Sequence, residues 1–248
     1  MAILRFRFSE RPELWDRIVG LSAEVWPEYN RHGDVLNRYW DRLYPEFPDY
    51  QFVLYDESAD EVLAEGHTIP VAWSGVPDDL GPGIDASIVA GFHLRETGAQ
   101  PTALCALAAE IPPRHRRRGL APVLLAAMAD IGRAAGLPAL IAPVRPSWKE
   151  RYPLTPIDRY VRWVRADGAP LDPWIRVHTG MGAAIGPALP ESMRITGSVH
   201  EWEAWTGMAF PESDRYVFPG GLAVVDVDRE KDLGAYWEPN VWLMHTLG

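Results

Sequence analysis

Alternating and uninterrupted apolar stretches along the chain predict its β-strands. Residues 4–8 alternate as L-R-F-R-F, which is the period of a half-buried strand. Residues 51–55 and Glu61–Val71 are two further strand patterns separated only by the turn-forming segment E-S-A-D, so they predict a β-hairpin. Unbroken apolar runs at residues 103–109 and Ala139–Val144 predict buried strands.

Apolar residues at helical spacing predict three longer helices, over residues 13–25, 35–43 and 120–136. The third ends at Gly136 with Pro138 just beyond, which is a strong stop signal. This helix joins the two buried strands, and a strand–helix–strand unit of this length is sufficient for a parallel crossover. We therefore expect the strands on either side of it to run parallel.

The second half of the chain contains one clear helix start. Asp172 followed by Pro173 is a typical N-cap pair, and the short helix is expected over residues 174–181. Residues 193–205 alternate and predict a long strand, with residues 222–227 as its hairpin partner.

Two segments rich in Gly, Pro and polar residues, residues 74–98 and 145–173, predict irregular insertions. The aromatic tail, residues 236–248, is expected to dock onto the body of the protein. No Ser/Gly linker divides the 248 residues, so we expect a single domain over residues 1–248 that carries the two insertions.

The composition narrows the class of protein. A net charge of −10 argues against a nucleic-acid-binding surface. No apolar run reaches the length of a membrane-spanning helix, and the N-terminus lacks the apolar segment of a signal peptide. We therefore expect no membrane contact and a cytoplasmic location. The single cysteine, Cys105, excludes an internal disulfide framework and gives no cysteine-based metal site.

One basic, glycine-containing turn stands out against this acidic background. It reads R-H-R-R-R-G over residues 114–119 and lies between a predicted buried strand and a predicted helix. A helix N-terminus offers free backbone N–H groups and the positive end of the helix dipole. Beside three consecutive arginines, these groups predict an anion site. The alternative is a solvated loop with surface arginines.

This turn resembles the signature of a known acyltransferase family. Residues 116–121, R-R-R-G-L-A, match R-x-x-G-x-A, a variant of the Q/R-x-x-G-x-G/A motif of the GNAT acyltransferase superfamily. The match extends upstream through I-P-P-R-H and downstream through Leu124, Leu125 and Met128. The resemblance implies an α/β (α+β) GNAT fold, in which a mixed sheet of about seven strands is splayed by a bulge in the fourth strand and flanked by helices.

The resemblance also implies acetyl-CoA or another acyl-CoA as co-substrate, and no metal. The pyrophosphate is expected to bind the turn and helix start, at Arg116, Arg117, Arg118, Gly119, Leu120 and Ala121. The kink at Glu110–Ile111 is expected to be the bulge, with the pantetheine arm bonded to the backbone of Ile111. Pro122 lacks an N–H group, but proline is tolerated in a first helical turn.

A donor to the leaving thiolate is suggested by the family pattern. Many members carry a tyrosine at the position that His178 occupies in V-H-T-G-M-G-A, residues 177–183. An imidazole at that position is able to donate a hydrogen bond to a thiolate, and Thr179 is a neighbouring donor. A histidine packed on the helix and satisfied by the backbone is the alternative. Tyr152 and Tyr160 are the replacement candidates.

A general base is harder to assign from the sequence. The strand positions where family members often carry one fall at Cys105 and Leu107, and neither residue type is a convincing base. Glu110 has the opposite parity on the strand, but a bulge would turn it inward. An ordinary surface or bulge carboxylate is the alternative. We expect the other candidates to be exposed residues on strands: His67, His200, Glu201 and Glu203.

Late aromatic residues complete the set of candidates, and they line either an acceptor pocket or an enlarged core: Trp202, Trp205, Tyr216, Trp237 and Trp242. The first functional hypothesis is an acyl-CoA-dependent N-acyltransferase with a small amine acceptor, with room for a large or partly apolar one. The alternatives are a GNAT-like malonyl-CoA decarboxylase or S-acyltransferase, and a non-catalytic CoA-binding module. A monomer and a homodimer both fit the resemblance.

Overall fold

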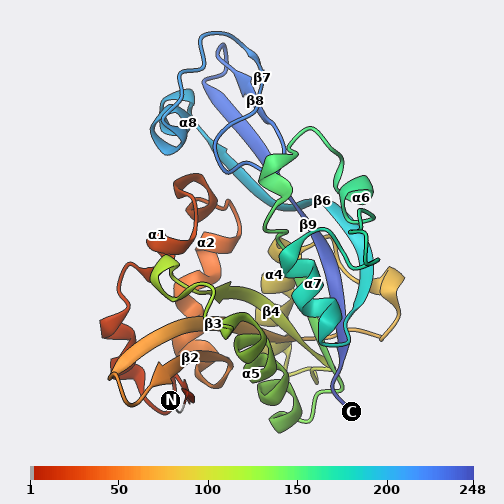
Figure 1. The fold of residues 1–248 in the computed structure, drawn as a ribbon. Coiled ribbons are helices and arrows are strands. Elements are labelled where there is room, and N and C mark those ends of the chain that lie inside the picture. Colours follow the sequence, from red (N-terminus) through yellow and green to blue (C-terminus); the bar gives the residue numbers. More distant parts are fainter. Residues whose placement is uncertain (1–2) are drawn as a thin grey trace.

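A mixed β-sheet organises the computed structural model, which describes residues 3–248 (Figure 1). In this part of the chain the sheet has nine strands in the order β1-β2-β3-β4-β5-β9-β8-β7, and β6 lies along the other edge of β9. Within it only β4 and β5 run parallel; every other pair is antiparallel. The strands are β1 Ile3–Arg7, β2 Gln51–Asp56, β3 Glu61–Val71, β4 Ala103–Glu110, β5 Ala139–Val144, β6 Ala184–Gly197, β7 Asp214–Tyr216, β8 Val225–Asp228 and β9 Leu233–Thr246.

Helices cover both faces of the sheet. The α-helices are α1 Leu21–Val25, α2 Leu36–Tyr39, α3 Leu43–Glu46, α4 Ile84–Thr97, α5 Leu120–Ala134, α6 Ile157–Tyr160, α7 Pro173–Gly180 and α8 Val199–Thr206. The 3₁₀ turns are η1 Pro12–Arg17, η2 Glu28–Arg31, η3 Trp40–Arg42, η4 Pro48–Tyr50, η5 Pro77–Asp79, η6 Pro113–His115 and η7 Lys149–Arg151. No helix in this described part is long and apolar enough to cross a membrane.

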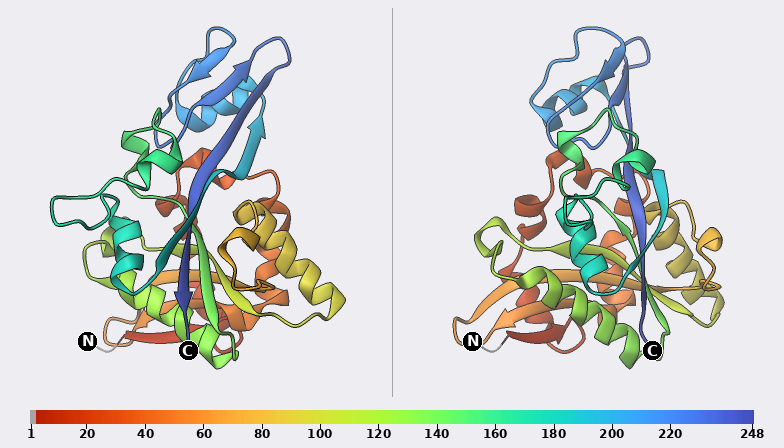
Figure 2. Two further views of the ribbon diagram at one scale, coloured as in Figure 1. Left: turned by 90° about the vertical axis from the view of Figure 1, so that its right-hand side faces the viewer. Right: turned by 45° about the vertical axis from the view of Figure 1, so that its right-hand side comes forward.

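The core is divided between the two faces and a distal part. Helix α5 buries Leu124, Leu125 and Met128 against one face, and α4 buries Ile88 and Phe92 against the other. The distal part contains α8, β7, β8 and the adjoining ends of β6 and β9, with an aromatic core of its own. Figure 2 shows that the long strand β9 runs from this distal part down through the body.

The sheet opens between β4 and β5. Among the described residues these two strands pair only at Leu104–Leu140 and Cys105–Ile141, so the later half of β4 has no partner on that side. The predicted bulge lies in β4, but at Leu107 rather than at Glu110–Ile111, because His67 pairs with Ala108 while Thr68 pairs with Ala106. The antiparallel ladder with β3 then continues as far as Glu110, opposite Glu65.

Several sequence-predicted elements are confirmed. The hairpin of β2 and β3, the strand β5 and the helix α5 lie where their apolar patterns place them, and β4 and β5 are parallel. Asp172 caps α7 as predicted: its carboxylate accepts the N–H groups of Trp174 and Ile175 at 2.9 and 3.2 Å. The helix predicted over residues 13–25 is instead two short pieces, because Gly20 adopts a left-handed conformation between them.

Other predictions were wrong. Residues 74–98 are irregular only in their first part; the rest is α4, in which Ile84, Ile88 and Phe92 repeat at helical spacing. The strand predicted over residues 193–205 ends at Gly197, because Ser198 and Glu201 form a capping box that begins α8.

The strand pairing at the C-terminus also differs from the prediction. The predicted hairpin partner, residues 222–227, overlaps β8, which pairs with β7 and β9 and not with β6. The tail, residues 236–248, docks onto the body as expected, and it does so by supplying most of β9 at an interior position in the sheet.

Candidate active site

The basic turn enters α5 through two left-handed residues. Arg117 has φ of 63° and Gly119 has φ of 74°, and α5 begins at the next residue, Leu120. Gly119 is the N-cap and supplies no side-chain cap, so the first N–H groups of α5 have no side-chain acceptor at that position. Consecutive backbone N–H groups in such a turn form an anion-binding concavity. The turn therefore has the backbone geometry that the sequence predicts.

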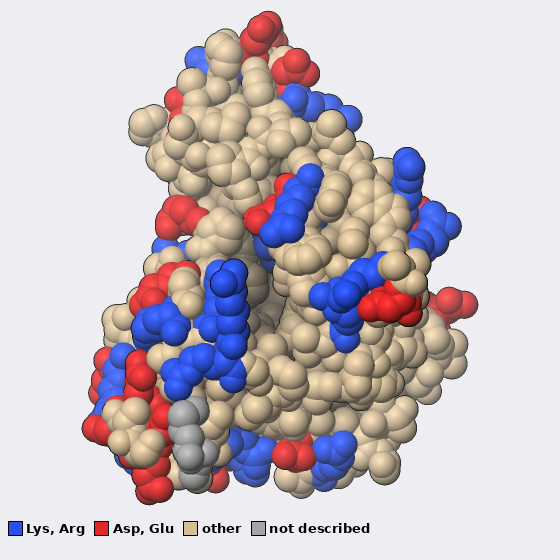
Figure 3. Space-filling view, in the orientation of Figure 1, with Lys and Arg blue, Asp and Glu red and all other residues tan. Residues whose placement is uncertain are grey.

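Salt bridges and hydrogen bonds hold the turn against the strands before it. Arg116 donates from Nε to the carbonyl of Ile111 at 3.3 Å, and Arg118 donates to Nδ1 of His115 at 2.8 Å. The other ring nitrogen of His115 lies 3.0 Å from a Glu61 carboxylate oxygen. Figure 3 shows Lys and Arg side chains gathered over this segment, beside a hollow in the surface.

The bulge in β4 changes which face of the sheet Glu110 reaches. Ala106 and Ala109 both pack on the α5 side, whereas Leu107 belongs to the core on the α4 side. A strand without a bulge would place residues 106 and 109 on opposite faces. Glu110 consequently points away from α5, toward α1 and the residues that follow it, as the sequence allows.

Glu110 lies in a buried cluster with two residues of β3. Its carboxylate, the carboxylate of Glu65 and the imidazole of His67 offer atoms that all lie within 4.8 Å of one another. His67 Nε2 is 3.2 Å from Glu65 Oε1. All three residues are buried, with Glu65 the most accessible at 5%. The prediction that His67 is an exposed strand residue is therefore wrong.

Indole and phenol groups surround the two carboxylates. Trp15 Nε1 and the Tyr44 hydroxyl donate to Glu65 Oε1 at 2.5 and 3.1 Å. Trp26 Nε1 donates to Glu110 Oε1 at 2.7 Å, and the Ser22 hydroxyl lies 3.4 Å from the same oxygen. The second oxygen, Glu110 Oε2, is buried without a hydrogen-bond partner among residues 3–248.

The three groups shift one another's pKa values. Burial alone raises the pKa of Glu65, but the charge of His67 and the bonds from His67, Trp15 and Tyr44 outweigh it, so its pKa is below the usual value. Burial lowers the pKa of His67, and the two carboxylates reverse this to a net rise. Burial raises the pKa of Glu110, and the neighbouring Glu65 charge adds to the rise against the opposing effect of His67.

The types and spacing of these three side chains, two carboxylates and one imidazole, are also those of a metal site. Both carboxylates, however, already accept indole N–H groups, and His67 is paired with Glu65. These hydrogen bonds and the His67–Glu65 pair therefore satisfy most of the polar atoms of the cluster without a metal ion.

His178 lies on the opposite side of the sheet from Glu110. It is buried on α7, its Nδ1 lies 2.9 Å from Nε2 of His245 on β9, and its own Nε2 has no partner within the described chain. Burial and the neighbouring His245 lower the pKa of His178 to about 3, so the imidazole is neutral at physiological pH. Thr179 donates from its hydroxyl to the Arg176 carbonyl at 3.3 Å.

The remaining sequence candidates lie elsewhere. Tyr160 donates to the capping carboxylate of Asp172 at 2.9 Å, and Tyr152 packs at a tilted angle on its ring. Trp202 and Trp242 are buried core residues, and Trp205 and Tyr216 pack partly buried against the distal core, so the structure favours the core interpretation for these four, whereas Trp237 is exposed. Three candidates predicted on a strand lie instead on α8 in the distal part, namely His200, Glu201 and Glu203.

Sequence reasoning missed most of the Glu110 environment. Trp15 lies within a predicted helix, and Trp26 and Tyr44 lie just beyond the ends of two predicted helices, so nothing in their patterns marks a site. One signal was available: Glu65 and His67 are ionisable residues two apart in the middle of a largely apolar strand. Polar groups on one face of a buried strand need partners, and they therefore indicate a site or a network.

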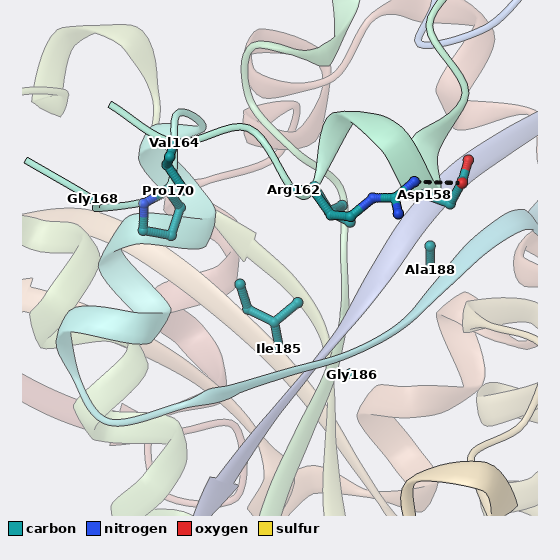
Figure 4. A pocket seen from close by; sticks show the side chains of 9 residues that line it. Asp158, Arg162, Val164, Gly168, Pro170, Ile185, Gly186 and Ala188 are labelled. Carbon is teal, nitrogen blue, oxygen red and sulfur yellow. Dashed lines mark hydrogen bonds and ion pairs between the residues drawn. The ribbon is translucent and has the colours of Figure 1, made fainter. Parts of the chain in front are cut away.

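A separate surface cavity of about 570 Å³ lies between residues 158–170 and the start of β6. Figure 4 shows Ile185 pointing into it, with the Asp158–Arg162 ion pair at one end. None of its lining residues belongs to β4 or to the basic turn. It is therefore distinct from the splay between β4 and β5.

The sheet order, the splay at β4 and the signature turn at α5 match the GNAT fold, so the predicted fold is confirmed, and the similarity to known proteins supports the prediction of the GNAT superfamily. No family model matches the chain. The structure is similar to the loading GNATL domain of CurA from Lyngbya majuscula, with a TM-score of 0.62, 17% identity and coverage of 100% of this chain and 98% of that one.

Two further similarities extend over nearly the whole chain. The GphF GNAT-like decarboxylase in complex with isobutyryl-CoA has a TM-score of 0.57 at 19% identity, with complete coverage of both chains. In sequence, the chain is 27% identical over 270 residues to the arginine N-acetyltransferase AvaD of Aspergillus versicolor, covering 96% of this chain and 92% of that protein.

Proposed function

We propose that this protein transfers an acetyl group from acetyl-CoA to the amine of a small acceptor, and that arginine is the first acceptor to test. The observation that carries the proposal is the meeting of two features, the unpaired half of β4 and the anion-binding start of α5. The similarity to an arginine N-acetyltransferase over 96% of the chain supports this choice of reaction and acceptor.

The donor site follows from these two features. The pyrophosphate binds the backbone of residues 116–121, where the helix dipole and the arginines favour negative charge. The pantetheine arm lies along β4 near Ile111, because the backbone on that edge lacks a strand partner after Cys105. Pro122 removes one N–H group from the first turn but leaves those before it in place.

The reaction is a direct attack by the acceptor amine on the thioester carbonyl. Glu110 accepts a proton from the ammonium group as an N–H bond breaks, and the nitrogen lone pair forms the new C–N bond. The C–S bond of the thioester then breaks, and the thiolate leaves and takes the second proton that the nitrogen loses as the amide forms, so CoA is released as the thiol. Glu110 and His178 lie on opposite sides of the sheet, which supports separate roles at the acceptor and donor ends.

His178 stabilises the leaving thiolate by donating a hydrogen bond. A neutral imidazole has one N–H group, and with a pKa of about 3 His178 is not an imidazolium acid at neutral pH. If His245 donates from Nε2 to His178 Nδ1, the N–H group of His178 is on its unpartnered Nε2. Thr179 is the second candidate for this role.

The test is a direct assay of the purified protein. With acetyl-CoA and arginine we expect equal amounts of free CoA thiol and acetylarginine, measured by thiol titration and mass spectrometry. Agmatine, lysine and ornithine serve as alternative acceptors. Release of CO₂ from malonyl-CoA without an acceptor would favour a decarboxylase instead. If acetyl-CoA binds but no amine in the panel is acetylated, the proposed function is wrong.

A further inference from the structure

The protonation state of His67 can be assigned from its hydrogen bonds. The side-chain amide of Gln51 donates from Nε2 to the carbonyls of Phe47 and Thr68 at 3.1 and 3.0 Å, which fixes the orientation of the amide. Its oxygen therefore faces Nδ1 of His67, at 3.1 Å, and accepts an N–H group there. On the other side, Nε2 of His67 faces a carboxylate oxygen of Glu65 at 3.2 Å.

Both ring nitrogens of His67 consequently face hydrogen-bond acceptors. A neutral imidazole has only one N–H group, so it would leave one of these contacts without a proton. The ring that satisfies both is the imidazolium. This agrees with the raised pKa of His67, which the charges of Glu65 and Glu110 produce against the effect of burial. One positive charge thus lies beside two buried carboxylates, with atoms of all three groups within 4.8 Å of one another.

We propose that His67, held by Glu65 and Gln51, is a positioning residue that keeps Glu110 ionised and aimed at the acceptor amine. This proposal rests on the proposed function, in which Glu110 is the proton acceptor. It assigns a role to two residues of β3 that have no part in donor binding, and it gives the aromatic segment around Trp26 a role in the chemistry.

The geometry leaves one oxygen of Glu110 for the proton. Oε1 accepts the indole N–H of Trp26 and faces the Ser22 hydroxyl, so its orientation is fixed. Oε2 is buried and has no partner in the part of the protein that the structure describes. A buried carboxylate oxygen without a donor is costly, and an ammonium group of the acceptor would supply the missing donor.

The charges around Glu110 determine how readily it stays ionised. The titratable groups that face it are Glu65 and His67 from β3 and Tyr44 from α3. Glu65 disfavours the Glu110 carboxylate, whereas the His67 imidazolium and the Trp26 N–H group favour it. Without the imidazolium, two buried carboxylates would face each other, and Glu110 would hold its proton to a higher pH.

The experiment measures kcat/KM for the acceptor as a function of pH in the wild-type protein and in His67→Gln and Trp26→Phe. Loss of the positive charge in His67→Gln should move the acid limb of the pH profile, where kcat/KM falls as Glu110 is protonated, upward by about one pH unit. Trp26→Phe removes one hydrogen bond to the carboxylate and should move it in the same direction by less. At pH 7 we expect kcat to fall about tenfold in His67→Gln, with the KM for acetyl-CoA unchanged.

The control is Trp40→Phe. Trp40 packs on the ring of His67 with centroids 4.7 Å apart, but it donates no bond to either carboxylate. Its acid limb should coincide with that of the wild type. A purely structural role for His67 would lower kcat equally at every pH.

Unmoved acid limbs in active His67→Gln and Trp26→Phe would overturn the proposal while leaving acetyl transfer intact. If His67→Gln does not fold, Trp26→Phe decides. Stoichiometric zinc binding that His67→Gln abolishes would make the cluster a metal site and would also overturn it. A wild-type protein without any transferase activity would instead contradict the proposed function itself.

Discussion

At the scale of single residues, the proposed donor site depends on backbone conformations that few side chains adopt. Gly119 has a φ of 74° at the N-cap of α5, where glycine avoids the strain that a Cβ atom introduces. Arg117 also has a left-handed backbone conformation, with a φ of 63°, and its Cβ atom introduces that strain. Non-glycine residues in this region are uncommon and concentrate at functional sites. The strain at Arg117 therefore points to a turn shaped for ligand binding.

The first prediction is that Gly119→Ala weakens acetyl-CoA binding more than its cost in stability suggests. No atom of the described chain lies within 4 Å of a Cβ added at this position, so the cost comes from φ alone and should be about 1 kcal/mol. Relaxation of that strain rotates the N–H groups at the start of α5, and we expect the Kd for acetyl-CoA to rise about tenfold, measured by calorimetry.

Gly98→Ala is the matched control for this substitution. Gly98 also has a left-handed φ, 67°, with no described atom within 4 Å of an added Cβ, but it caps the C-terminus of α4. It should lose the same stability without any change in acetyl-CoA affinity. Equal affinities in the two variants would show that the turn at Gly119 does not bind the cofactor.

At the scale of elements, the sequence predicts those that carry a clean period and a clear boundary. Helix α5 has glycines at both boundaries, Gly119 and Gly136, and a regular repeat of apolar residues. It was therefore predictable from the sequence, and the structure confirms it. The strand predicted over residues 193–205 is wrong in its second half, because Ser198 and Glu201 lie within the alternating pattern and their capping hydrogen bonds begin a helix there. A local signal that sets a boundary is therefore more informative there than periodicity.

The two halves of the candidate site differ in the same way. The donor half is one contiguous stretch around the signature turn, and a contiguous motif can be recognised in a single sequence. The acceptor half combines η1, α1, α3, β3 and the end of β4, brought together only by folding. The bulge at Leu107 decides where Glu110 points, and no residue type in A-L-A marks it.

The second prediction concerns the packing of α7 on β9. Unfolded histidine binds a proton below about pH 6.5, whereas folded His178 stays neutral down to about pH 3. The unfolded state therefore holds more protons in this window, and the free energy of unfolding falls as the pH drops. For one histidine we expect about 2 kcal/mol of this loss between pH 7 and pH 5.

His178→Gln should remove that part of the pH dependence, measured by urea unfolding at both pH values. His93→Gln, an exposed position on α4, should leave it unchanged. The same His178 variant tests the thiolate role, since kcat should fall with little change in the Kd for acetyl-CoA. An unchanged pH slope in His178→Gln would show that His178 is protonated in the folded protein.

At the scale of the whole molecule, one buried ion pair connects the distal part to the body. Arg145 follows β5, and its guanidinium pairs with the Glu238 carboxylate on β9. It also donates to the Tyr29 hydroxyl at 3.0 Å and to the carbonyl of Gly220 at 2.8 Å. Asn30 and Tyr236 donate to the same carboxylate. The network thus joins η2, β5, β9 and the loop before β8.

The same region lies beside the acceptor half of the candidate site. Trp26 bonds to Glu110 at the end of β4, and four residues later Asn30 bonds to Glu238 at 3.1 Å. The segment between them therefore spans the splay from β4 to β9. Any loosening of the Arg145 network should reach Glu110 through this short connection, and so stability and acceptor binding are expected to change together.

The last prediction follows from the cost of leaving a buried charge unpaired. Arg145→Met keeps the aliphatic packing but leaves the Glu238 carboxylate without its cation, and we expect a loss of about 3–5 kcal/mol in the free energy of unfolding. Arg145→Met/Glu238→Gln should recover part of it, because the neutral amide leaves no unpaired charge and its oxygen still accepts one of the two bonds, from Asn30 or from Tyr236. Arg215→Met, which breaks an exposed pair with Asp226, should cost at most about 1 kcal/mol. Amide exchange should accelerate around residues 218–222 in Arg145→Met while β2 and β3 keep their protection. If the single and double variants were equally stable, the pair would make no net electrostatic contribution, and the aromatic core alone would hold the distal part in place.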